Sequence, residues 1–154
     1  MKRICLSLMA ATLGLVSPAF AAQTVDKTEA PQADNIPPSP EAVAITREEG
    51  KGFSIRHFPS GLRLYTYDND LPGQSNCTGG CSSAWPPVRA AEGSKPVGNW
   101  TLVPRTDGLP QWAYQGKPIY VRYHDQVEAP TGDGLDGVWH LLGNIPVGGA
   151  VAAK

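Results

Sequence analysis

The chain has 154 residues, of which 41% are hydrophobic and 18% are charged, and its formal net charge is −1. This length and composition allow one domain with a modest hydrophobic core. The near-neutral charge, without a basic run, argues against nucleic-acid binding and against electrostatic attachment to a membrane surface.

Residues 1–21 have the three parts of a secretory signal peptide: a basic pair, Lys2-Arg3, an apolar stretch over 4–17, and a small-x-small site that ends at Ala21. The apolar stretch is shorter than the about 20 residues that a membrane span needs. We therefore expect cleavage near Ala21 and a periplasmic or secreted product. The first mature residue would be Ala22 rather than a cysteine, so no lipid or membrane anchor is expected.

Residues 22–48 are rich in proline and alanine and contain no aromatic residue. Such a segment buries too little apolar surface to order itself, which predicts a disordered leader up to residue 48. The small, glycine-containing segment 147–154 is expected to be a flexible tail.

The pattern of residue types changes at about residue 50. From there, short runs of alternating apolar and polar residues follow one another, separated by Gly, Pro and Asp. This pattern is typical of short strands and turns, and no stretch has helical periodicity. The runs lie at 53–57, 62–66, 100–103, 112–114, 119–123 and 138–142. They predict a single all-β, antiparallel domain over residues 49–146.

The domain also repeats itself. The pattern Gly61-Leu62-Arg63-Leu64-Tyr65, followed by Asp70 and Trp85, reappears as Gly116-Lys117-Pro118-Ile119-Tyr120, followed by Asp125 and Trp139. The matched positions are 54 or 55 residues apart. A constant offset of this size indicates two tandem supersecondary units, each of which needs its twin to complete a core. We expect the first copy at about 50–97 and the second at about 98–146.

These matched residues also resemble a known family. The segment from Tyr65 through Tyr67 to Asp70 fits the pattern Tyr, any, aromatic, any, any, Asp, and Tyr120 and Asp125 repeat its ends. Over residues 50–143 the chain is similar to the bacterial secreted-repeat family of unknown function, many members of which are lipoproteins. The resemblance implies a location in the cell envelope and carries no agreed activity.

One position departs from that pattern: Arg122 stands in the second motif where the first has the aromatic Tyr67. If the aromatic ring packs in a pocket, the corresponding pocket of the second copy is expected to differ.

Each motif offers a tyrosine and an aspartate five residues apart, which suggests two pairs, Tyr65 with Asp70 and Tyr120 with Asp125. A buried tyrosine whose hydroxyl donates to a carboxylate satisfies its polar tip, so the pairs are interpreted as a folding device. The alternative is that the tyrosines serve as redox or ligand-contact groups. Trp85 is expected to fill the core, as is its counterpart in the second copy.

Cys77 and Cys81 are the two cysteines that follow the predicted signal peptide. In an oxidising compartment they are expected to form a disulfide that closes a small loop. The alternative is a metal site, because two thiolates together with His124 or His140 could hold copper.

No nucleophile–base signature is evident, so no catalytic residue is assigned and the protein is not expected to be an enzyme. The favoured hypothesis is a non-catalytic binding or structural repeat of the cell envelope whose partner is an envelope protein or a small ligand, without a cofactor. The alternative is a periplasmic copper- or electron-handling protein that uses Cys77, Cys81 and a histidine.

Overall fold

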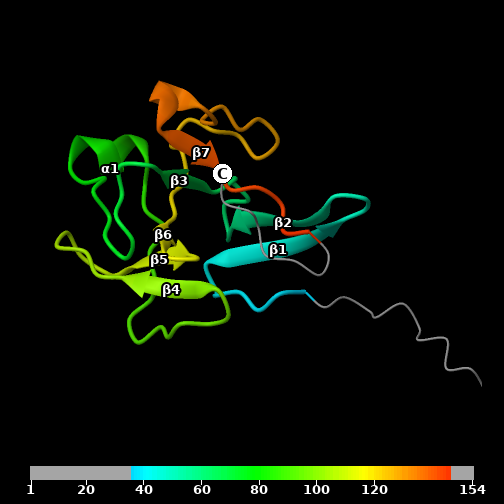
Figure 1. The fold of residues 1–154 in the computed structure, drawn as a ribbon, viewed down its shortest axis with the longest axis horizontal. Coiled ribbons are helices and arrows are strands. Elements are labelled where there is room, and N and C mark those ends of the chain that lie inside the picture. Colours follow the sequence, from blue (N-terminus) through cyan, green and yellow to red (C-terminus); the bar gives the residue numbers. More distant parts are fainter. Residues whose placement is uncertain (1–35, 147–154) are drawn as a thin grey trace, which may run out of the picture. The chain divides into compact units, whose positions relative to one another are not determined.

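The computed structural model describes residues 36–146. The predicted signal peptide (1–21), the first part of the leader (22–35) and the tail (147–154) lie outside the described residues. Within the described range the chain forms short strands in three small antiparallel sheets, with one five-residue helix and one 3₁₀ turn (Figure 1). The predicted all-β, antiparallel class is therefore confirmed.

The first sheet is a hairpin of β1 (Val43–Glu48) and β2 (Gly52–His57), which lie side by side in Figure 1. Its register pairs Val43 with His57 and Glu48 with Gly52. The predicted disordered leader is thus wrong for residues 43–48. The proline-rich composition of residues 22–48 masks a short β-branched run, and Val43 at its start packs into the core, 5% exposed.

The second sheet has the order β4 (Trp100–Val103), β5 (Gln111–Tyr114) and β6 (Lys117–Pro118). Asp107 and Gly108 lie in the turn between β4 and β5. The predicted strand at 119–123 is reduced to isolated bridges, which join Tyr120 to two different partners. Residues 84–88 run alongside it in the antiparallel direction: the amide of Val88 donates to Ile119, and the amides of Val121 and Tyr123 donate to Pro86 and Ala84. The ladder stays incomplete because Pro86 and Pro87 have no amide hydrogen to donate.

The third sheet joins segments that are distant in the sequence. Strand β3 (Tyr65–Tyr67) pairs with β7 (Trp139–Leu141), and Tyr67 lies opposite Trp139. Helix α1 (Gly80–Ala84) follows the first motif, and the 3₁₀ turn η1 (Leu135–Gly137) precedes β7. The third sheet therefore brings the first motif, in β3, beside the last residue of the repeated pattern, Trp139 in β7.

Buried side chains form two clusters. The larger cluster lies among the β1–β2 hairpin and the β4–β5–β6 sheet, and it includes Trp100 and Trp112, each 1% exposed. The smaller cluster contains Tyr65, Cys77, Trp85, Tyr120 and Trp139. The four tryptophans are buried, as expected for core filling, and the smaller cluster gathers the aromatic residues that the two motifs share.

Candidate functional site at the two tyrosine motifs

The two motif tyrosines pair through their backbones. The amide of Tyr65 donates to the carbonyl of Tyr120 at 2.9 Å, and the amide of Tyr120 donates to the carbonyl of Tyr65 at the same distance. This reciprocal bridge is antiparallel. It places each tyrosine beside the turn that follows the other tyrosine, rather than beside its own.

The side chains continue this exchange. The Tyr65 hydroxyl donates to Oδ2 of Asp125, and the Tyr120 hydroxyl donates to Oδ2 of Asp70 at 2.7 Å. The predicted pairing of Tyr65 with Asp70, and of Tyr120 with Asp125, is therefore wrong. Sequence spacing alone pairs each tyrosine with the aspartate of its own turn. The antiparallel bridge between the two tyrosines instead places each tyrosine beside the turn of the other motif. We call Tyr65 with Asp125 the closed pair and Tyr120 with Asp70 the open pair.

The closed pair is buried, and further protein groups bond to both of its members. The other carboxylate oxygen of Asp125, Oδ1, accepts the amide of Thr131 at 3.0 Å and its hydroxyl at 2.8 Å. The guanidinium of Arg122 lies 3.6 Å from the same oxygen, and the Asp125 side chain is fully buried. The amide of Gly132 donates to the Tyr65 hydroxyl at 3.3 Å. These contacts satisfy a buried charge, which would otherwise be costly.

Gly132 is required by the closeness of the aromatic rings. A Cβ at this position would lie 2.5 Å from the Trp85 ring and 2.9 Å from the Tyr65 ring. Any larger residue would push apart the cluster that buries the tyrosine.

The open pair has a different set of contacts. Oδ1 of Asp70 accepts the amide of Asn76 at 2.7 Å, and the Tyr120 hydroxyl lies 2.8 Å from the hydroxyl of Ser75. Asp70 is only partly buried, and this burial raises the pKa of its carboxyl.

Arg105 supports the open pair, and no motif or spacing in the sequence points to this role. Its side chain is 1% exposed and donates to the hydroxyl of Ser75, to Oε1 of Gln111 at 2.8 Å and to the carbonyl of Cys77 at 2.9 Å. It also pairs with Asp107 at 2.5 Å, and its guanidinium holds the pKa of the Asp107 carboxyl well below its usual range. One buried arginine thus connects β4, β5 and the disulfide loop.

A stack of flat groups runs through the site. The rings of Trp85 and Trp139 are parallel within 5°, with centroids 3.7 Å apart. Tyr67 stacks on Trp139 at 4.3 Å, and the guanidinium of Arg122 lies 5.7 Å from the centre of the Trp85 ring. Arg122 thus takes the place of the missing aromatic residue, since a guanidinium stacks on an aromatic face much as a ring does.

The tyrosine hydroxyls remain protonated in this environment. Burial raises the pKa of Tyr65, and the hydrogen bond to Asp125 raises it further. Burial also raises the pKa of Tyr120. Neutral phenols that already donate to carboxylates are hydrogen-bond donors here, which suits a structural contact better than proton transfer at neutral pH.

The predicted cysteine and histidine ligands do not come together. Cys77 and Cys81 are joined by a disulfide, with their Cα atoms 5.2 Å apart. Nε2 of His140 lies 2.7 Å from Asp68, whereas His124 is exposed with its ring against Tyr123. Within residues 36–146, no three His, Cys, Asp or Glu side chains are grouped to hold a metal ion. The copper hypothesis stays a prediction without a ligand cluster in this part of the chain.

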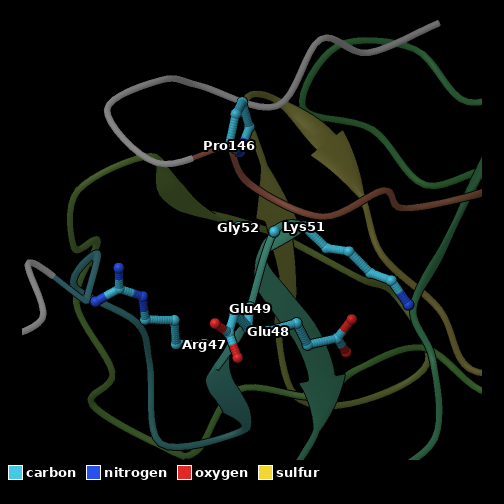
Figure 2. Close-up of a pocket in the computed structure, with 7 residues that line it drawn as sticks. Arg47, Glu48, Glu49, Lys51, Gly52 and Pro146 are labelled. Atoms are coloured by element: carbon cyan, nitrogen blue, oxygen red, sulfur yellow. The ribbon is translucent and has the colours of Figure 1, made fainter.

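Two hollows are of interest. One, of about 660 Å³, lies at the turn between β1 and β2, and Figure 2 shows that Arg47 and Lys51 at its rim point in different directions. It contains no motif residue. The other, of about 230 Å³, lies beside the open pair, and its walls include Tyr67, Asp68 and Asp70.

The comparisons with known proteins give one family match. Residues 101–142 match a family described as a secreted repeat of unknown function. The stretch that carries the second motif is therefore similar to a secreted repeat. The match includes Tyr120, Asp125 and Trp139 of the cluster, and it confirms the resemblance seen in the sequence. Neither the curated proteins nor the solved structures give a match.

The family description fits an exported protein. Between residues 36 and 146, no helix is long and apolar enough to cross a membrane.

Proposed function

We propose that this protein is an exported, non-catalytic module of the bacterial cell envelope, in which two structural repeats complete one another. The observation that carries the proposal is the exchange of hydrogen bonds between the motifs, Tyr65 to Asp125 and Tyr120 to Asp70. Both tyrosine hydroxyls are engaged inside the protein, so the motif holds the fold together and leaves the work of binding to the surface.

Matched contacts support the repeat interpretation. The turn that joins Leu71 to Gln74 has its counterpart in the turn that joins Gln126 to Ala129, 55 residues later. Likewise, the amide six residues after each aspartate donates to that aspartate: Asn76 to Asp70, and Thr131 to Asp125. Equal contacts at an equal offset are expected of a duplicated supersecondary unit.

The chemistry of the cluster supports a role without catalysis. A hydrolytic site needs a nucleophile activated by a neighbouring base. Here the tyrosine hydroxyls donate to carboxylates, the cysteines are joined to each other, and His140 lies against Asp68. The partner that we infer is an envelope protein or a small ligand, rather than nucleic acid, because the formal charge of −1 gives no basic surface.

We place the protein in the periplasm or outside the cell after cleavage near Ala21. Support comes from the family description and from the signal-peptide pattern of residues 1–21.

A binding module takes up a fixed, stoichiometric amount of its partner, whereas an enzyme converts many molecules of substrate. The stoichiometry therefore tests the proposal. The protein is purified from the periplasm of a bacterial host and mixed with a washed envelope fraction and, separately, with periplasmic extract. We expect binding to at least one of them that saturates at a fixed ratio, and recovery of the protein with unchanged mass. Conversion of any component in large excess over the protein, or a lack of saturable binding to both, would overturn the proposal.

The same preparation tests the copper hypothesis, which no contact in the described residues favours. We expect native mass spectrometry to give a mass two hydrogens below that of the reduced mature chain, with no change on adding copper. Retained copper that is lost in the His140→Ala variant would instead establish a metal site.

A further inference from the structure

The hollow beside the open pair lies between the turn that follows β3 and the turn that joins β5 to β6. Its volume is about 230 Å³, and the two turns are tied together by a hydrogen bond from the amide of Gly73 to the carbonyl of Gly116 at 3.1 Å. The walls that matter for a ligand are Tyr67, Asp68, Leu71, Pro72, Gln115 and Lys117.

The corresponding place beside the closed pair is filled. A Cβ built on Gly61 would meet both methyl groups of Val127 at 3.4 Å, whereas a Cβ built on the matched Gly116 would meet nothing within 4 Å. The carbonyl of Val127 is in turn held by Nη1 of Arg56 at 2.7 Å. The open hollow is therefore a property of the first motif and not a by-product of the repeat.

The charges on the walls indicate what kind of molecule fits. The carboxylates of Asp68 and Asp70 repel an anion, and the ammonium group of Lys117 repels a cation. A neutral ligand meets no charge repulsion from these walls. The carboxylates accept hydrogen bonds, whereas the side chains of Gln115 and Lys117 can donate them. A ligand that presents many hydroxyl groups, each both donor and acceptor, matches this mixture.

The remaining walls are apolar, and they include Leu71, which is 55% exposed. Together with Pro72 and the Tyr67 ring, this side chain offers a surface for the C–H face of a sugar. The volume is below the usual range of about 300–1,000 Å³ for drug-sized ligands, which limits the occupant to one ring.

We propose that this hollow binds one neutral pyranose ring of a saccharide. The inference rests on the proposed function as an envelope binding module and names the class of ligand for it. Tyr67, Leu71 and Pro72 contact the apolar face of the ring, and Asp68, Gln115 and Lys117 bond its hydroxyl groups.

The test uses the mature protein labelled with ¹⁵N and two probes, methyl glucoside and methyl N-acetylglucosaminide, each titrated to roughly 100 mM because single-ring sites are weak. We expect saturable shifts of the amide signals of Asp68, Gln115 and Gly116, with little change at Ser60 and Gly61. The absence of saturable shifts with both probes would overturn the proposal. So would stronger shifts of the same signals with choline or with acetate.

The variant that tests the contact is Gln115→Gly. Gln115 has φ of 50°, a left-handed conformation that glycine adopts without strain, so the fold should persist. Loss of one hydrogen bond to the sugar should weaken binding up to about tenfold. The matched control is Ser60→Gly, at the equivalent place beside the closed pair, which should leave sugar affinity unchanged. Equal affinity in Gln115→Gly and the natural protein would contradict the assignment.

The two proposals fail separately. If the sugars do not bind but the envelope fraction still binds saturably, the saccharide site is wrong and the proposed module stands. If neither binds, both are wrong.

Discussion

The two tyrosine–aspartate pairs have the same residue types, and the motifs that supply them have the same spacing, yet the pairs sit in different surroundings. In the closed pair the Asp125 side chain is fully buried and bonded to Thr131 and to Tyr65, with Arg122 close by. In the open pair Asp70 is partly exposed and lines a hollow. The same motif thus gives a fully buried aspartate side chain in the closed pair and a partly exposed one in the open pair.

The difference arises from neighbours that lie outside the motif. Val127, anchored by Arg56, covers the closed side, whereas Pro72 leaves the space above Gly116 open. The open side carries the Cys77–Cys81 disulfide, and the closed side has Gly132 at the position matched to Cys77. The two motifs thus make the same type of hydrogen bond, while the surroundings of the open pair leave a hollow beside it.

The largest predicted effect separates the two aspartates. Asp125→Ala removes the acceptor for three donors in a dry site, the hydroxyls of Tyr65 and Thr131 and the Thr131 amide, and should lower the free energy of unfolding by about 3–5 kcal/mol. Asp70→Ala should cost only about 1–3 kcal/mol, because Asn76 is exposed to water and the Tyr120 hydroxyl keeps its contact with the hydroxyl of Ser75. Urea unfolding measures both values.

If Asp125→Ala does not fold, the milder variants Tyr65→Phe and Tyr120→Phe give the same comparison. The removal of either hydroxyl should destabilise, with the larger loss expected for Tyr65. Equal losses of unfolding free energy in the closed-pair and open-pair variants would mean that the two pairs contribute equally to stability.

The second prediction tests the exchange itself with double-mutant cycles. Tyr120→Phe combined with Asp70→Ala should show a coupling free energy of about 1–2 kcal/mol, because the two groups share a hydrogen bond. The pair Tyr65→Phe with Asp70→Ala, which belongs to one motif, should couple by less than about 0.5 kcal/mol. The reverse order of the two couplings would restore the pairing within each motif.

The smallest predicted effect concerns alkaline pH. The folded protein raises the pKa of both motif tyrosines, whereas the unfolded chain ionises them near pH 10. Their contribution to stability is thus complete below that pH and is lost as the pH rises, by about 1 kcal/mol per tyrosine between pH 10 and 11. Unfolding measured from pH 8 to 11 should fall less steeply in Tyr120→Phe. An unchanged slope would mean that Tyr120 ionises as easily in the folded protein.

The sequence was sufficient for the class of fold and for the residues of the cluster. The alternation of short runs predicted strands, and the offset of 55 residues identified Tyr65, Tyr120 and their aspartates. It could not decide which tyrosine meets which aspartate, because both pairings place identical residues together and only the antiparallel bridge between the tyrosines distinguishes them.

Other features had no signal in the sequence. Arg105 lies in no motif, and its side chain donates to four residues: Asp107 and Gln111 nearby in the sequence, and Ser75 and Cys77, which the fold brings to it from the first motif's side. The start of the domain was missed because β1 gains its stability from pairing with β2 and not from its own composition. The hollow beside Asp70 reflects differences outside the motif, such as Pro72 where the closed side has Val127, and their effect is visible only in three dimensions.

The crossed contacts have a consequence for cleavage of the chain. Gly93 lies in an exposed loop between the two motifs, where a protease can reach the backbone. A cut there would leave the two fragments interlocked, since β3 of one pairs with β7 of the other and each fragment holds the aspartate that the other's tyrosine requires. The nicked protein should migrate as a single species until denaturant is added, and the separated halves should reassociate by fragment complementation.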